Sequence, residues 1–457
     1  MSALAEIQTS SCNTRDGTFF SAISTNQLMN RFPLRPIAVA LCVTLAQIAV
    51  AHFLLAPDGT FSERYATLIQ HDSYWFMNIV NRGYGTTVPP VGYKTMEISN
   101  VAFFPAYPAI AALVHYVVRL ETTYALLITA QAAAFGFWSY FFLFCQRWNI
   151  SPLLQFFGAL SILAHPAAFF LVAGYSESLF LMALVGFIYW STTEGRTARV
   201  LAAIHGIVMS ATRIVGLPCA AFPIVRSLVA RGWRSLRAPW SWLRQYGNAI
   251  ALTLVAMLGA LLFFAYCQLR WGNWNLYMLT QAAGWGISPD YLAVFKPSSY
   301  RWLVPALHDP TEASQMSVPL GASLFGAIAI CEIVMWRARG RSGPVGAATQ
   351  TRPAVSSDWS HRAMDWPMRV GIYFCAATVF YLSISGVASV NMESMLRYEF
   401  SAHALLVLAF LNFLGQFETA PKLLRAFGMG AVALACAAGL SLQAWYVWNF
   451  TRGNWVA

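Results

Sequence analysis

The sequence predicts an all-α, polytopic membrane protein with about eleven transmembrane helices (roughly nine to twelve). Mean hydropathy is +0.54 and 58% of the 457 residues are hydrophobic, so little polar sequence remains to cover a soluble surface. Charged residues make up 10%, whereas soluble domains carry about 25%. Aromatic residues reach 15%, and Trp and Tyr can anchor helices at membrane interfaces.

The predicted spans are apolar runs that can cross a hydrocarbon core of roughly 30 Å at about 1.5 Å per residue. Two of them are short, and some are expected to be broken. The runs lie at 37 to 55, 103 to 119, 123 to 145, 153 to 173, 177 to 192, 200 to 225, 247 to 269, 318 to 336, 370 to 390, 400 to 414 and 427 to 448.

The basic residues indicate how the chain is oriented. Much of the net charge of +11 lies in two gaps between apolar runs, at 226 to 246 and 337 to 369. The positive-inside rule predicts that these are cytoplasmic loops, so nucleic acid is not expected as a partner. The full prediction is a cytoplasmic N-terminal tail at 1 to 36, one membrane domain at 37 to 448 with outer loops at 56 to 102 and 270 to 317, and a C-terminal tail at 449 to 457.

The cysteines and the common catalytic motifs exclude several classes of site. The eight cysteines are scattered singly, which is typical of neither a disulfide framework nor a metal site. The sequence contains no P-loop, G-x-G-x-x-G, H-E-x-x-H or G-x-S-x-G pattern. We therefore expect no metal, no other cofactor and no bound nucleotide.

The densest group of polar residues lies in the first outer loop, at residues 70 to 85 (QHDSYWFMNIVNRGYG). Tyr74, Trp75, Phe76 and Ile79 recur there at roughly helical spacing beside charged residues. This pattern predicts interfacial helices in the loop.

The same loop carries a resemblance to a known family. Residues 70 to 85, followed by residues 102 to 108 (AFFPAYP), resemble the PIG-V-type mannosyltransferases, which are polytopic enzymes of the GT-C glycosyltransferase class. One departure is His71, where the family often has Trp before the Asp. Later blocks follow in the family's order: 174 to 180 (GYSESLF), 210 to 217 (SATRIVGL), 272 to 274 (GNW) with Gln281 and Trp285, and 395 to 398 (MLRY).

The resemblance implies a GT-C-like fold and an inverting transfer of mannose from polyprenyl- or dolichyl-phosphate mannose to a glycan or lipid-linked acceptor. Asp72 is the candidate general base, because attack on the anomeric carbon requires removal of a proton from the acceptor hydroxyl. The leaving lipid phosphate is already anionic and needs cations rather than an acid. The residues expected to bind donor or acceptor are His71, Arg82, Lys94, Glu177, Arg213, Arg397 and Tyr398.

The expected location is a bacterial inner membrane or the endoplasmic reticulum membrane, with the active site on the non-cytoplasmic side. An alternative function is a secondary transporter or lipid flippase with Arg213 and Glu177 in its pathway. A non-catalytic scaffold is a third possibility.

Structural roles stay open for several of these residues. Asp72 could cap its helix. Arg213 lies alone in an apolar run and could pair with Glu177. Glu399 could be the counter-ion of Arg397, and His71 could serve only in interfacial packing.

Overall fold

The computed structural model describes residues 34–86, 99–232, 239–301, 314–341, 364–417 and 422–456. This part of the chain is helical and contains no β-strand, which confirms the all-α prediction. Its α-helices are α2 (Leu34–Ile48), α3 (Phe61–Ala66), α4 (Asp72–Arg82), α5 (Ala106–Val118), α6 (Thr122–Arg147), α7 (Pro152–Leu163), α8 (Glu177–Ser191), α9 (Arg196–Thr212), α10 (Gly216–Cys219), α11 (Phe222–Arg231), α12 (Pro239–Trp271), α13 (Leu276–Trp285), α15 (Ser317–Arg341), α16 (Trp366–Val387), α17 (Met395–Phe417) and α18 (Lys422–Phe450).

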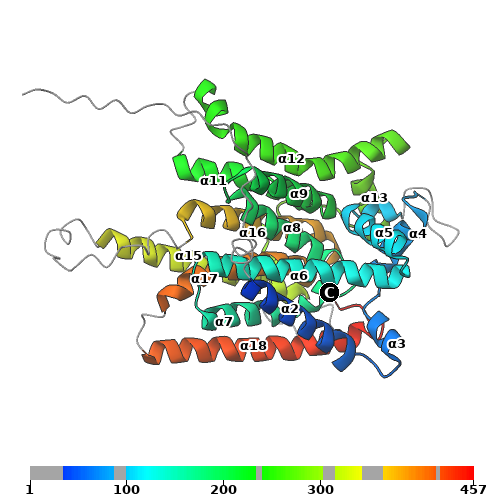
Figure 1. Ribbon diagram of the computed structural model, residues 1–457, viewed down its shortest axis with the longest axis horizontal. Helices are drawn as coiled ribbons and strands as arrows, with labels where there is room; N and C mark the ends of the chain where they lie inside the picture. Colours follow the sequence, from blue (N-terminus) through cyan, green and yellow to red (C-terminus); the bar gives the residue numbers. More distant parts are fainter. Residues whose placement is uncertain are drawn as a thin grey trace, which may run out of the picture.

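Most of the long helices run alongside one another, with α12 at one edge of the bundle and α18 at the other (Figure 1). The short helices α3, α4, α5 and α13 gather at one end (Figure 1). Helices α3 and α4 lie within residues 56 to 102, where the sequence predicts helices in the first outer loop. One end of the bundle therefore carries most of the short elements.

Six helical segments in the described residues are long and apolar enough to cross a membrane, in agreement with a polytopic membrane protein. Three shorter apolar helices, α5, α7 and α8, accompany them. The total number of spans stays a prediction. The six segments are Leu34–Leu54, Thr122–Arg147, Tyr246–Trp271, Ser314–Arg337, Trp366–Val390 and Arg425–Phe450.

The apolar run at 200 to 225 is not one continuous helix. It divides into α9, α10 and α11, and Arg213 lies in extended backbone just after α9 (φ −150°, ψ 145°) rather than inside a helix. Pro218 and Pro223 lie in the first turns of α10 and α11, where a missing N–H is tolerated but a continuous helix is not. Because of this break, Arg213 lies just beyond the C-terminal end of α9, where the backbone is no longer helical.

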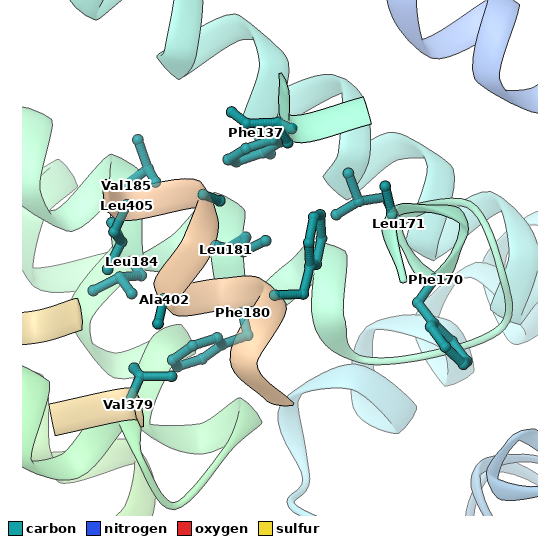
Figure 2. Packing of buried hydrophobic residues seen from close by; sticks show 14 of the residues in the cluster. Phe137, Phe170, Leu171, Phe180, Leu181, Leu184, Val185, Val379, Ala402 and Leu405 are labelled. Carbon is teal, nitrogen blue, oxygen red and sulfur yellow. The ribbon is translucent and has the colours of Figure 1, made fainter. Parts of the chain in front are cut away.

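Helix α8 lies in the centre of the core. It packs against α6, α9 and α17, and its hydrophobic residues are buried around most of its circumference, as expected for a central helix. Figure 2 shows its side chains among those of neighbouring elements: Phe137, Phe170, Leu171, Phe180, Leu181, Leu184, Val185, Val379, Ala402 and Leu405. The core therefore fixes the position of Glu177, the first residue of α8.

Helices α9 and α12 approach closely through small residues. The Ser210 hydroxyl donates to the Ala256 carbonyl oxygen over 2.6 Å. A Cβ added at Gly206 would lie 2.5 Å from the Ala256 Cβ, and one added at Gly259 would lie 2.1 Å from the Ile207 carbonyl oxygen. Small residues at such crossings let two backbones pack directly, which is how many membrane helices associate.

Replacing Gly259 by Ala is therefore expected to destabilise the protein by about 1–3 kcal/mol, because the new methyl group meets backbone that cannot rotate away. Gly247→Ala, on the same helix, is the matched control, since no atom of the described residues lies within 4 Å of its added Cβ. The thermal unfolding midpoint in detergent measures both effects. Equal midpoints for the two variants would contradict close packing at Gly259.

Candidate active site

Four charged side chains, at or just beyond the ends of four separate helices, meet at one end of the bundle. Asp72 is the first residue of α4, Glu177 is the first residue of α8, Arg213 follows α9, and Arg397 lies in the first turn of α17. We refer to these four residues as the charged tetrad. Because each lies at or near a helix end, the lengths of the helices set where the charges meet.

Arg397 is the central member of the tetrad. Its Nη1 lies 2.6 Å from Asp72 Oδ2, and its Nε lies 3.3 Å from Glu177 Oε1. Arg213 Nη1 donates to the same Glu177 oxygen over 3.1 Å. The Arg397 and Glu177 side chains are 5% and 2% exposed, whereas that of Asp72 is 21% exposed. Asp72 is therefore the carboxylate of the tetrad that an incoming group reaches most easily.

Aromatic rings surround the two guanidinium groups. The Arg213 and Arg397 guanidinium carbons lie 4.8 Å and 5.0 Å from the centre of the Tyr398 ring, and Arg397 lies 5.1 Å from that of Tyr175. Cations over aromatic faces are stabilised by the ring quadrupole, most strongly where water is excluded. The rings thus help to hold two arginines side by side.

The turn before α4 sets the position of Asp72. His71 has φ of 47°, a conformation that non-glycine residues adopt only under constraint. A Cβ added at Gly174 would lie 2.3 Å from the Ile69 Cδ1, so a larger residue here would force the Ile69 side chain to move. This close approach brings the start of α4 beside the start of α8, and so Asp72 beside Glu177.

The tetrad lines a cavity of about 610 Å³. Much of the remaining wall is apolar, with Phe76, Phe104, Ile214 and Leu382 among its side chains. Tyr398 also lines it, so five of the predicted site residues converge on one space: Asp72, Glu177, Arg213, Arg397 and Tyr398.

The other predicted site residues lie elsewhere. His71 is outside the cavity lining and packs against the Trp455 ring, with 4.9 Å between the ring centres. Arg82 is exposed at the far end of α4, about 15 Å from Asp72 along the helix axis. Lys94 lies outside the described residues.

His71 is half-buried, and burial is the main reason that its pKa lies below the ordinary value of 6.5. The nearby Arg397 acts in the same direction, whereas the Asn454 backbone and Asp72 act against it. The lowered pKa predicts a neutral imidazole at pH 7. His71 therefore adds no positive charge for binding a phosphate.

The sequence left purely structural roles open for Asp72, Arg213 and Glu399, and the structure confirms the role of Arg213 but contradicts the other two. Asp72 follows the N-cap position, which His71 occupies, and in the described part of the chain its carboxylate binds Arg397 and makes no capping hydrogen bond. The capping interpretation is therefore wrong. The Arg213 to Glu177 ion pair is present. Glu399 is not the counter-ion of Arg397, because its carboxylate pairs with His165 at 2.8 Å.

His165, Glu399 and His403 form a second polar cluster, which the sequence did not indicate. The His165 Nδ1 accepts a hydrogen bond from the Ala167 N–H over 3.1 Å, so its Nε2 carries the hydrogen and donates to Glu399. In this tautomer Nε2 has no free lone pair for a metal. The geometry therefore favours a hydrogen bond that anchors the beginning of α17, next to Arg397 and Tyr398.

Two aromatic residues near the tetrad were missed as site residues. Tyr175 belongs to one of the sequence blocks but has no charge to draw attention. Trp455 lies in the segment predicted to be a C-terminal tail, yet its ring lies 5.5 Å from the Arg397 guanidinium and its neighbour Val456 is fully buried. No local pattern could reveal that contact, because it depends on where α18 ends.

Comparisons with models of known families and with curated protein sequences find no match. Several solved structures are similar at low identity. ArnT from Cupriavidus metallidurans bound to undecaprenyl phosphate is 13% identical with a TM-score of 0.37, over 85% of this chain and 78% of that one. The same protein in the apo state is 15% identical with a TM-score of 0.36, over 84% and 78%.

The archaeal oligosaccharyltransferase AglB from Archaeoglobus fulgidus, in complex with an inhibitory peptide and a dolichol-phosphate, is 11% identical with a TM-score of 0.44. The match covers 92% of this chain and 56% of that chain, so this chain spans just over half the length of AglB. At such low identities and TM-scores, these solved structures give no information about the chemistry of the site in this chain.

Proposed function

We propose that this protein is an inverting glycosyltransferase that transfers mannose from polyprenyl- or dolichyl-phosphate mannose to a glycan or lipid-linked acceptor. The observation that carries the proposal is the convergence of one accessible carboxylate, Asp72, and two arginines on a single cavity with largely apolar walls. A base for the acceptor, cations for a phosphate and an apolar surface for a prenyl chain are the three features that this reaction requires.

Asp72 is the proposed general base. Arg397 holds its Oδ2, and within the described residues no protein donor binds its Oδ1. That oxygen is available to take the proton of an acceptor hydroxyl while the hydroxyl oxygen bonds to C1 of the sugar. The bond from C1 to the phosphate oxygen breaks at the same time, and its electron pair leaves with the lipid phosphate. The attack from the opposite side inverts C1.

The two arginines are the proposed phosphate-binding groups. Without a donor, their charges are balanced by Asp72 and Glu177, so the tetrad is neutral as a whole. An entering phosphate gives the arginines a third anionic partner and loosens their hold on Asp72. Donor binding would thereby free the base, which links occupancy of the phosphate site to proton removal.

The apolar wall is the proposed path for the prenyl chain. Phe76, Phe104, Ile214 and Leu382 line the same cavity as the tetrad, so a lipid tail can stay in apolar surroundings while its phosphate meets the arginines. In this proposal the end of the bundle that carries the tetrad faces the non-cytoplasmic side of a bacterial inner membrane or of the endoplasmic reticulum membrane, and the positive-inside rule supports this orientation.

The test uses the purified full-length chain with polyprenyl-phosphate [³H]mannose and total membrane lipid as a source of acceptors. Mannose should pass from the donor to a second product, and free polyprenyl phosphate should accumulate in equal amount. Movement of intact labelled donor across proteoliposome membranes without cleavage would instead support the flippase alternative. An unchanged, immobile donor would overturn both.

A further inference from the structure

A second, smaller cavity of about 260 Å³ lies beside the first. It is not part of the charged tetrad, and most of its lining side chains are polar. The lining residues that the argument uses are Asp290, Lys296, Ser298, Arg301 and Gln315.

The same short segment of the chain borders both cavities. Pro289 and Tyr291 line the large cavity, whereas Asp290, between them, lines the small one. The Asp290 N–H donates to the Ser385 carbonyl oxygen over 2.8 Å, which ties this segment to the end of α16. The two cavities are therefore neighbours along this segment of the chain.

Within the described residues, no protein group satisfies one hydrogen-bond acceptor of Gln315. Its Nε2 donates to the Asn391 carbonyl oxygen over 3.1 Å, and this bond fixes which end of the amide is the oxygen. The Oε1 is shielded from solvent and has no partner in the described part of the chain. A buried acceptor left unpaired costs about 1–3 kcal/mol, so a ligand that donates a hydrogen bond would bind favourably here.

The other polar groups add both donors and acceptors. Asp290 and Lys296 form an ion pair, and the hydrogen bond from Lys296 keeps the pKa of Asp290 below its ordinary value. The Ser298 hydroxyl and the Arg301 guanidinium contribute further donors. A fully ionised phosphate can accept hydrogen bonds but cannot donate them, whereas a sugar hydroxyl does both. The mixture therefore fits hydroxyl groups better than an anion.

The loop under this cavity is strained. Asn391 and Met392 line the cavity and have φ of 54° and 63°, and Ser394, just before α17, has φ of 66°. Non-glycine residues in this conformation cost about 1–2 kcal/mol each, and such strain gathers at functional sites. The same loop leads directly to Arg397, so it connects the small cavity to the tetrad.

We propose that the small cavity is a subsite for a hydroxyl-rich group, namely a sugar unit of the acceptor. The link to the acceptor rests on the proposed function, and it makes the acceptor a glycan or a glycolipid rather than a plain lipid alcohol. In this arrangement the acceptor sugar occupies the small cavity, and the hydroxyl to be glycosylated belongs to the part of the acceptor that enters the large cavity beside Asp72.

The experiment measures binding of methyl α-mannoside, methyl α-glucoside and inorganic phosphate to the full-length protein in detergent, by ligand-observed ¹H and ³¹P NMR titration. At least one glycoside should bind the wild type, and Gln315→Leu and Asp290→Ala should each weaken that binding about five- to tenfold, as expected for one lost hydrogen bond. Gln155→Leu is the matched control, since the Gln155 amide also donates to a backbone carbonyl but lies on α7.

Three results would overturn the subsite: no glycoside binds the wild type, binding is unchanged in Gln315→Leu, or only phosphate binds. Donor cleavage with water as the sole acceptor is measured on the same preparations and should be unchanged in the control Gln155→Leu, because Gln155 lies on α7 and lines neither cavity. Glycoside binding that is lost in the variants, without any donor cleavage by the wild type, would keep the subsite and reject the proposed function.

Discussion

Asp72→Asn is expected to lower sugar transfer by about 10²–10⁴-fold while leaving folding and membrane insertion intact. Asn keeps the shape of the side chain and an oxygen that can accept from the Arg397 Nη1, which lies 2.6 Å from Asp72 Oδ2 in the wild type. It cannot, however, take the proton of an acceptor hydroxyl. Initial rates of transfer from polyprenyl-phosphate mannose, at equal amounts of purified protein, measure the loss.

Arg82→Gln is the control for this variant. Arg82 lies on the same helix as Asp72 but is exposed at its far end, so its loss should leave the rate close to that of the wild type. Donor binding should survive in Asp72→Asn, because the arginines that are proposed to hold the phosphate remain. A turnover near that of the wild type in Asp72→Asn would reject Asp72 as the base.

Arg397→Met is expected to cause the largest loss of stability of any single change at the site, about 3–5 kcal/mol. The reason is that Arg397 contacts both Asp72 and Glu177, and its removal leaves two carboxylates with a single cation between them. Glu177 is 2% exposed, so water cannot replace the lost partner. The thermal unfolding midpoint in detergent measures the effect.

Two further variants separate lost charge balance from lost packing. Arg397→Met combined with Glu177→Gln removes one charge of each sign and should recover part of the stability. Arg213→Met breaks one ion pair of a side chain that is 16% exposed and should cost less than Arg397→Met. If the double variant were no more stable than Arg397→Met alone, the loss would come from packing rather than from unbalanced charge.

The fold class was predictable from the sequence because each apolar run carries its own evidence. A helix that crosses a membrane must satisfy its backbone internally and present apolar side chains to lipid, so length and hydropathy are sufficient to find it. The break at Arg213 was less accessible. Pro218 and Pro223 indicate that the run is interrupted, but they do not show on which side of the break the arginine lies.

The candidate residues were predictable as residue types, since Asp72, Arg213 and Arg397 are charges beside or within apolar sequence, where isolated charge is costly. Their pairing was not. Asp72 and Arg397 are 325 positions apart. By sequence alone, Glu399 was an equally reasonable partner for Arg397, but in the structure the Glu399 carboxylate binds His165.

The sequence by itself determined that this chain is a bundle of membrane helices with its densest polar segment around Asp72, because hydropathy, charge and helical spacing are local properties. Only the tertiary structure decided that Arg397 joins Asp72 to Glu177 and that Trp455 reaches the same arginine. It also decided that Gln315 lines a second cavity and that its Oε1 has no partner among the described residues. Those relations depend on where helices end and cross, and packing between distant segments sets both.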